Sequence, residues 1–199
     1  MTEPAPTTAS SPVHVDYHTF ELTDSDVRVP MGFDTSNGLV FSRPGHAVIC
    51  TGINSGPVNV SIQLRRYPPE RADTGAWDEV VDHSVETRTG HLRVTCVMDD
   101  PPELPPLTPF GPGSYRVRVH ARGRDTAPDG HVVDPGEDYL LIVWPDELRP
   151  DQVHKQTDRY GAQLRGQPGR PAPPKEHVTD AESERQHLMQ ARLQRRSSQ

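Results

Sequence analysis

The sequence has few cysteines, few aromatic residues and no long hydrophobic run. Its two cysteines, Cys50 and Cys96, lie in apolar stretches without the spacing of a zinc site, so we expect reduced core residues. No stretch approaches the roughly 18 apolar residues of a membrane-spanning helix. The first 12 residues lack the basic and apolar regions of a secretory signal. These absences predict a cytoplasmic protein without a membrane span.

The motifs of common enzyme classes are also missing. The sequence contains neither G-x-S-x-G nor S-x-x-K, which carry serine nucleophiles, and neither G-x-G-x-x-G nor a Walker sequence, which bind phosphate groups. Both cysteines lie in apolar surroundings, which raise a thiol pKa and make a poor nucleophile. The sequence therefore predicts a protein that is not an enzyme and that needs no cofactor.

Charge is distributed unevenly along the chain. Residues 1–148 carry 11 Lys and Arg against 22 Asp and Glu, a net charge of −11, whereas residues 149–199 carry 10 against 6, a net charge of +4. Affinity for nucleic acid comes mainly from Lys and Arg, so the acidic body is not expected to bind it. An acidic body suits a basic protein partner, although it is also explained by solubility alone.

Short alternating runs separated by Pro- and Gly-rich turns fill the first three quarters of the chain. Gly90 in TRTG (87–90) predicts a hairpin between two of the runs, 77–86 and 91–98. The pattern predicts an all-β fold, an antiparallel β-sandwich or jelly roll of about eight strands. The eight predicted strands are 13–22, 38–42, 46–53, 58–64, 77–86, 91–98, 114–122 and 138–144.

Composition outside these runs predicts the domain boundaries. Residues 1–12 are rich in Pro, Thr and Ser and predict a disordered leader before a sandwich domain over 13–148. A helical stripe of Val153, Tyr160 and Leu164 predicts a short helix over 149–165, with Asp151 as its N-cap. Residues 166–199 read as a linker and a charged tail that is disordered or marginally helical when alone.

Four arginines form the one dense basic cluster of the acidic body. Arg116 and Arg118 share a strand face, and Arg122 and Arg124 follow at the end of the strand. Guanidinium groups bind carboxylates and phosphates through paired hydrogen bonds, so the cluster is a candidate binding site. The alternative is a set of salt bridges to neighbouring acidic strands, which we favour.

Two further groups are candidate sites. Asp99, Asp100 and Glu103 lie in a Pro-rich loop, and with Asp24, Asp26, Asp34, Asp73 and Asp78 they could form one acidic rim at an end of the sandwich. His14, Asp16 and His18 alternate along one strand face, a spacing that can gather metal ligands. No second strand offers a matching pair of ligands, so an exposed polar face is the preferred interpretation and no metal is expected.

Three segments carry a resemblance to a known family. They are VHVDYHTFEL (13–22), NGLVF (37–41) and GPGSYRVRV (111–119), in that order along the chain. Residues 13–144 resemble the competence protein J family of small β-sandwich proteins, inhibitors of a DNA-entry nuclease that are related to immunity proteins. The tail after residue 148 departs from that pattern. The strings YRVRVHARGRD and YLLIVWP are also similar to actinobacterial proteins of unknown function.

The leading hypothesis from the sequence is a non-enzymatic protein, of inhibitor or immunity type, that binds a basic protein partner such as a nuclease through acidic loops. The alternative is a β-sandwich that binds a small molecule or carbohydrate at Arg116, Arg118, Arg122 and Arg124.

Overall fold

Ten strands and one short helix make up the part of the chain that the computed structural model describes, residues 5–24, 32, 34, 36–96, 98–167 and 169. The strands are β1 (Thr7–Asp16), β2 (Thr19–Thr23), β3 (Val40–Arg43), β4 (His46–Cys50), β5 (Ser55–Leu64), β6 (Glu79–Thr87), β7 (Arg93–Thr95), β8 (Gly113–Arg122), β9 (Asp138–Pro145) and β10 (Gln152–Gln156). The helix is α1 (Arg159–Arg165). The prediction of a mostly β fold is confirmed.

All ten strands belong to one continuous sheet. Their order is β10-β6-β8-β9-β5-β1-β2-β4-β3, and β7 pairs with β2 outside this path. Each neighbouring pair is antiparallel except β5 and β9, which run parallel. The predicted antiparallel sandwich therefore needs correction. One mixed sheet replaces two separate sheets, because β9 inserts between β5 and β8 rather than pairing with its sequence neighbours alone.

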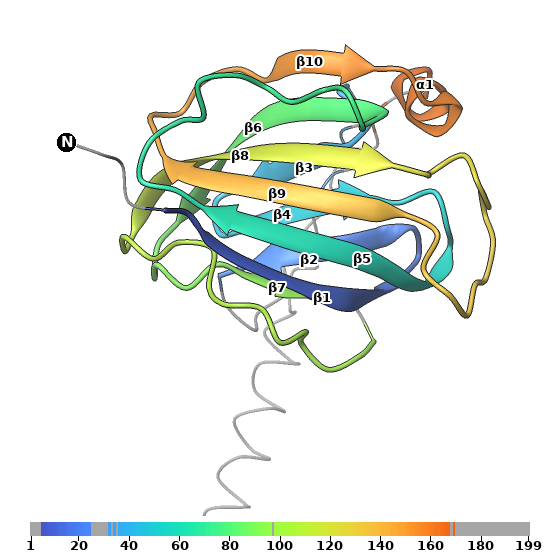
Figure 1. The fold of residues 1–199 in the computed structure, drawn as a ribbon, viewed down its shortest axis with the longest axis horizontal. Coiled ribbons are helices and arrows are strands. Elements are labelled where there is room, and N and C mark those ends of the chain that lie inside the picture. The colour runs from blue at the N-terminus through green and yellow to red at the C-terminus, as the bar shows by residue number, and fades with distance from the viewer. Residues whose placement is uncertain are drawn as a thin grey trace, which may run out of the picture.

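The sheet curls into a half-barrel, so that β2, β3 and β4 lie behind β5, β8 and β9 (Figure 1). Twist accumulates across a sheet of this width and brings its two ends together. At the seam the Ser42 hydroxyl, on β3, donates to the Ser84 carbonyl of β6 over 3.2 Å. The Gly45 amide donates to the Glu86 carbonyl over 2.8 Å. The curl therefore joins distant segments without a continuous backbone ladder.

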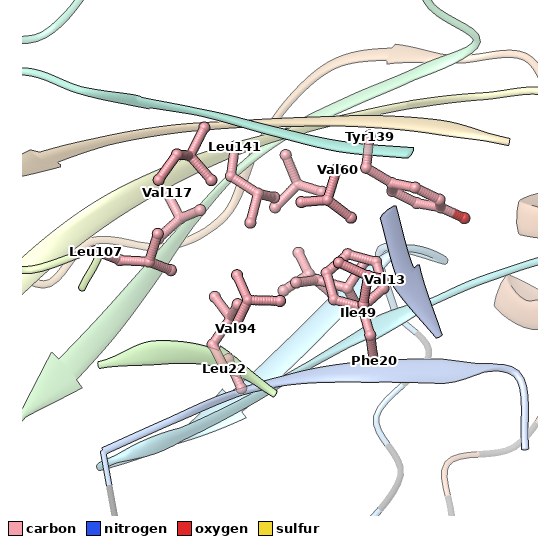
Figure 2. Close-up of a cluster of buried hydrophobic side chains, with 14 of the residues drawn as sticks. Val13, Phe20, Leu22, Ile49, Val60, Val94, Leu107, Val117, Tyr139 and Leu141 are labelled. Atoms are coloured by element: carbon pink, nitrogen blue, oxygen red, sulfur yellow. The ribbon is translucent and has the colours of Figure 1, made fainter. Parts of the chain in front are cut away.

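The core fills the space inside the curl. Figure 2 shows Val60, Val117 and Leu141 facing Phe20 and Ile49 across it. The Phe20 ring meets the Tyr139 ring edge-on, with centroids 5.2 Å apart. Each such side chain contributes about 1.5–3 kcal/mol when fully buried. Alternation along the strands places these residues on one face, as the sequence pattern predicts.

The predicted disordered leader is wrong from residue 7 onward. β1 begins at Thr7 and pairs with β5 along ten residues, from Thr7 opposite Leu64 to Asp16 opposite Ser55. The Ser10 hydroxyl lies 2.9 Å from that of Ser61. The ladder with β5 provides partners for the backbone hydrogen-bonding groups of this Ser- and Thr-rich segment, which has few apolar side chains to bury.

The predicted strand over 13–22 is divided by a tight turn. Tyr17 and His18 both adopt left-handed backbone conformations, with φ of 55° and 62°, and Asp16 pairs with Thr19 across them. The alternation predicts an inward Tyr17, but its side chain is 73% exposed. A two-residue turn of this kind reverses the chain and interrupts the alternation.

The predicted hairpin between 77–86 and 91–98 does not form. β6 pairs with β8 and β10, whereas β7 pairs with β2. Gly90 does adopt a positive φ of 77°, as the turn signal predicts. The turn is instead held by Asp24, whose carboxylate accepts hydrogen bonds from the Arg88 and Thr89 amides at 2.8 and 3.0 Å.

The predicted helix over 149–165 is half strand. β10 pairs with β6 over 152–156, with a register shift between Val153 and Lys155, and α1 begins only after Asp158. Asp158, not Asp151, is the N-cap, and its side chain accepts from the Gly161 amide. Residues 168 and 170–199, most of the predicted linker and tail, lie outside the described residues. Within the described part of the chain, no helix could cross a membrane.

Candidate functional site

The four arginines predicted as a binding cluster lie on β8 and just after it, and the chain itself occupies most of their hydrogen-bonding groups. Arg118 holds Asp82 with two hydrogen bonds, from Nε at 2.6 Å and from Nη2 at 3.0 Å. It also donates to the Arg71 carbonyl at 3.1 Å, and its guanidinium lies over the Trp144 ring. Burial tends to raise the pKa of Asp82, but hydrogen bonding to Arg118 lowers it below the ordinary value.

Arg116 fastens a second segment over the same face. Its guanidinium donates to the Arg149 and Pro150 carbonyls at 2.9 and 2.7 Å and to the Ser84 hydroxyl at 2.7 Å. Residues 65–78 and 146–150 thus cover the outer face of β8, which explains why the strand is buried on both faces. The polar residues of β8 point away from the core, as alternation predicts. They are still buried, because these two segments cover them.

The other two arginines lie at the far end of β8 and have different roles. Arg122 is half exposed, pairs with Asp138 at 2.8 Å and lies over the Trp77 ring. Arg124 is fully buried and binds Asp158 through Nε at 2.6 Å and Nη2 at 3.0 Å. Its Nη1 donates to the Gly38 carbonyl at 2.9 Å. Any ligand at the cluster would have to displace these internal partners.

Asp158 and Glu79 lie together where α1 docks on the sheet. The Glu79 carboxylate is fully buried, accepts from the Asp158 amide at 3.2 Å and accepts from Arg165 at 3.1 Å. Burial, reinforced by the neighbouring Asp158 carboxylate, raises the pKa of Glu79 to about 7 despite Arg124 and Arg165. Burial and the neighbouring Asp158 carboxylate therefore make Glu79 harder to ionise than an exposed glutamate.

The turn after β1 separates His14, Asp16 and His18, the weak candidates for metal ligands. His14 lies 3.8 Å from Asp16, whereas His18 turns away to Asp129 at 3.2 Å and stacks on the Tyr160 ring. The His18 Nδ1 atom also lies 3.3 Å from the Gly52 carbonyl. Among the described residues, no three His, Cys, Asp or Glu side chains could share a metal ion.

The acidic residues Asp99, Asp100 and Glu103 are exposed on one loop, residues 98–112, which we call the acidic loop. The loop contains no Lys or Arg. Its shape is fixed from within, because Leu104 and Leu107 are buried in the core. The Leu107 amide donates to the Leu92 carbonyl at 2.7 Å.

Other contacts and the composition of the acidic loop restrict its backbone further. Thr108 is buried, and its hydroxyl accepts from the Leu92 amide at 3.2 Å. The Tyr115 hydroxyl donates to the Gly111 carbonyl at 2.8 Å. Six prolines fix φ along the loop, at positions 101, 102, 105, 106, 109 and 112. The carboxylates are therefore presented on an ordered backbone.

The acidic loop also exposes two large apolar side chains. Met98 is 74% exposed and Phe110 is 47% exposed, both within the acidic loop. The Arg66 guanidinium lies 5.6 Å from the centre of the Phe110 ring. Exposed apolar and charged side chains on one loop are the kinds of residue from which protein interfaces are built.

The wider acidic rim is only partly present. Asp24 is buried and accepts hydrogen bonds from the side chains of Thr87 and Thr89, so it belongs to the fold. Asp78 accepts from the Gly123 amide at 3.0 Å, at the far end of β8 from the acidic loop. Asp26 lies outside the described residues. Asp34 and Asp73 are exposed.

The seam between β3 and β6 brings together a serine, a histidine and an aspartate that the sequence analysis missed. The Ser42 hydroxyl lies 2.7 Å from His83 Nε2, and His83 Nδ1 lies 2.7 Å from an Asp151 carboxylate oxygen. The three residues come from β3, β6 and the segment before β10. No local motif could have indicated them, because the curl of the sheet alone makes them neighbours.

Comparisons with known proteins give two structural likenesses. No family model matches the sequence, and no curated protein does. A structure described as crocagin biosynthetic gene J has 13% sequence identity and a TM-score of 0.44, covering 72% of this chain and 100% of that chain. ComJ from Bacillus subtilis, described as an inhibitor of the DNA-degrading activity of NucA, has 10% identity and a TM-score of 0.47. That match covers 73% of this chain and 100% of that chain.

ComJ belongs to the family that the sequence resembles.

Proposed function

We propose that the chain acts by binding a basic protein partner through the acidic loop, in the manner of an inhibitor or immunity protein. The observation that carries the proposal is the ordered, exposed and uniformly acidic loop 98–112. A nuclease is proposed as the partner because residues 13–144 resemble the competence protein J family. Such a partner would present Lys and Arg in a cleft shaped for nucleic acid.

Order in the acidic loop favours binding for a physical reason. A loop that is already fixed loses little conformational entropy when a partner docks, so more of the contact energy appears as affinity. Leu104 and Leu107 anchor the loop in the core, and the prolines stiffen it between the anchors. The partner therefore meets carboxylates that are held in place.

The charged and the apolar residues of the acidic loop contribute to binding in different ways. Asp99, Asp100 and Glu103 attract a basic surface and speed its approach, an effect that salt screens. Met98 and Phe110 supply apolar area that contact with a partner would bury. We therefore expect association to be strongest at low ionic strength and to depend on both kinds of residue.

Affinity capture with matched variants tests the proposal. The full chain is immobilised and exposed to extract of its own cells at low salt, beside the variant Asp99→Asn, Asp100→Asn, Glu103→Gln. The control variant Asp129→Asn, Asp134→Asn, Glu147→Gln removes the same charge from other exposed positions. We expect a basic protein to be retained by the wild type and the control but not by the acidic-loop variant. Equal retention by all three, or by none, would overturn the proposal.

A further inference from the structure

Ser42, His83 and Asp151 have the relative arrangement of an acyl-transfer triad. A nucleophile is activated when its hydroxyl reaches a base within about 2.6–3.2 Å and a third group orients that base. Both joining distances here are 2.7 Å. The order along the chain, Ser, His and Asp, has no bearing on this geometry, since such triads are recognised by their contacts.

The protonation pattern follows from the contacts. The Asp151 carboxylate can only accept at His83 Nδ1, so that nitrogen carries a proton. In the neutral ring Nε2 then presents its lone pair to Ser42, whose single hydroxyl proton turns from the Ser84 carbonyl, 3.2 Å away, to Nε2, 2.7 Å away. This is the tautomer in which the imidazole can take the serine proton.

Asp151 is itself held in place. Its second carboxylate oxygen accepts from Asn37 Nδ2 at 2.6 Å, and the Asn37 side-chain oxygen accepts from the Leu39 and Val40 amides at 2.9 Å each. Burial acts to raise the pKa of Asp151, but hydrogen bonding to His83 lowers it below the ordinary value. Asp151 is therefore an ionised positioning residue for the base.

The triad lies at the molecular surface. The side chains of His83 and Asp151 are 13% and 28% exposed, and Ser42 is partly exposed. A clasp that only closed the seam would need neither His83 nor Asp151, because the Gly45 amide already donates to the Glu86 carbonyl there, over 2.8 Å.

We propose that Ser42 is an activated nucleophile that accepts the acyl group of an activated ester. Ser42 Oγ bonds to the carbonyl carbon while its proton moves to His83 Nε2. The bond from that carbon to the ester oxygen breaks, and the departing oxygen takes the proton from His83. The products are an ester at Ser42 and a free alcohol. The proposal goes beyond the binding function and shares no residue with the acidic loop.

Covalent labelling of the full chain with a fluorophosphonate tests this assignment. The reagent bonds to an activated serine oxygen and loses fluoride, and intact-mass and peptide mass spectrometry locate the adduct. We expect one adduct, at Ser42, that is absent in Ser42→Ala. The variant His83→Gln should slow labelling at least about 100-fold, because a general base contributes roughly 100- to 10,000-fold.

Ser84→Ala is the matched control. Ser84 lies next to His83 on β6, and its hydroxyl accepts from Arg116 and from the Arg149 amide instead of contacting the base. Ser84→Ala should label at the wild-type rate. Thermal melts of each variant separate loss of reactivity from loss of folding. If a folded wild-type chain gives no more adduct than Ser42→Ala, or labels equally in His83→Gln, the triad is a structural clasp and the proposal fails.

Discussion

At the scale of single residues, the fold uses polar side chains in two opposite ways. Asp24 is surrounded by donors from the turn after β6, and its carboxylate replaces the backbone ladder that a hairpin would have supplied there. Tyr17 instead adopts a left-handed conformation with its ring largely in solvent. The first arrangement stabilises the fold, whereas the second costs free energy that the Tyr17 ring does not recover by burial.

Replacing Tyr17 by Asn should stabilise the chain. A left-handed conformation costs an ordinary residue roughly 1–2 kcal/mol, and Asn tolerates it better, so we expect the free energy of unfolding to rise by about 0.5–1 kcal/mol. Urea denaturation measures the change. Tyr67→Asn is the control, because Tyr67 is also exposed, at 55%, but has no positive φ. A destabilised Tyr17→Asn would show that the ring packs usefully against the fold.

Replacing Asp24 by Asn should destabilise the chain in a pH-dependent way. Burial tends to raise the pKa of Asp24, but hydrogen bonds from Thr87, Thr89 and the Arg88 amide lower it from 3.8 to about 2. A lowered pKa means that the carboxylate stabilises the fold above about pH 4 and loses that contribution as the pH falls toward 2.

We therefore expect Asp24→Asn to lower the free energy of unfolding by about 2–3 kcal/mol at pH 6. The difference from the wild type should shrink as the pH approaches 2, where protonated Asp24 resembles Asn. Denaturation curves across this range measure it, with exposed Asp134→Asn expected within about 0.5 kcal/mol of the wild type. A difference that stays constant with pH would contradict the assigned role of the Asp24 charge.

At the scale of elements, hydrophobic alternation predicted where strands occur but not how they pair. The runs at 58–64, 114–122 and 138–144 became β5, β8 and β9, because their apolar faces had to be buried. The partners β1 from residue 7 and β10 carry few apolar residues, and their pairing depends on neighbours remote in sequence. Local pattern also placed Arg116 and Arg118 outside without revealing that residues 65–78 and 146–150 cover them.

The docking of α1 combines apolar contact with a buried ion cluster. Leu164 packs with Phe41, Val48 and Cys50 on the outer side of the sheet. Burial raises the pKa of the Cys50 thiol to about 12, so this cysteine stays protonated. Glu79 contacts both the N-cap and Arg165 of the helix, so its protonation changes the docking energy of the whole element.

Glu79→Gln should stabilise the chain at alkaline pH. The pKa of Glu79 is raised from 4.5 to about 7, so the wild type loses stability as the pH rises from about 4.5 to 7 and stays at the lower level above that. Gln cannot ionise, so the free energy of unfolding of the variant should rise relative to that of the wild type across this range. The rise should be on the order of 2 kcal/mol at pH 8. Thermal or urea unfolding at both ends measures the gain. An equal difference at pH 4.5 and pH 8 would count against a buried, destabilising carboxylate.

At the scale of the whole molecule, the curl of the sheet brings together residues that are far apart in the sequence. It closes the core and brings Ser42 to His83. The loop after β7 projects from the sheet (Figure 1), and its carboxylates are exposed. The sequence predicted an acidic surface in the loops, because charge is visible in composition. It could not predict the triad, since only the path of the chain sets distances between residues 42, 83 and 151.

The central claim is that the acidic loop forms the binding surface, and the Kd for the captured basic partner tests it most directly. Calorimetry would compare the wild type with the variant Asp99→Asn, Asp100→Asn, Glu103→Gln at low and at high sodium chloride. We predict that salt weakens wild-type binding, that the variant binds at least about tenfold more weakly at low salt, and that its Kd changes less with salt. Equal Kd values and equal salt dependence for the two proteins would contradict the account.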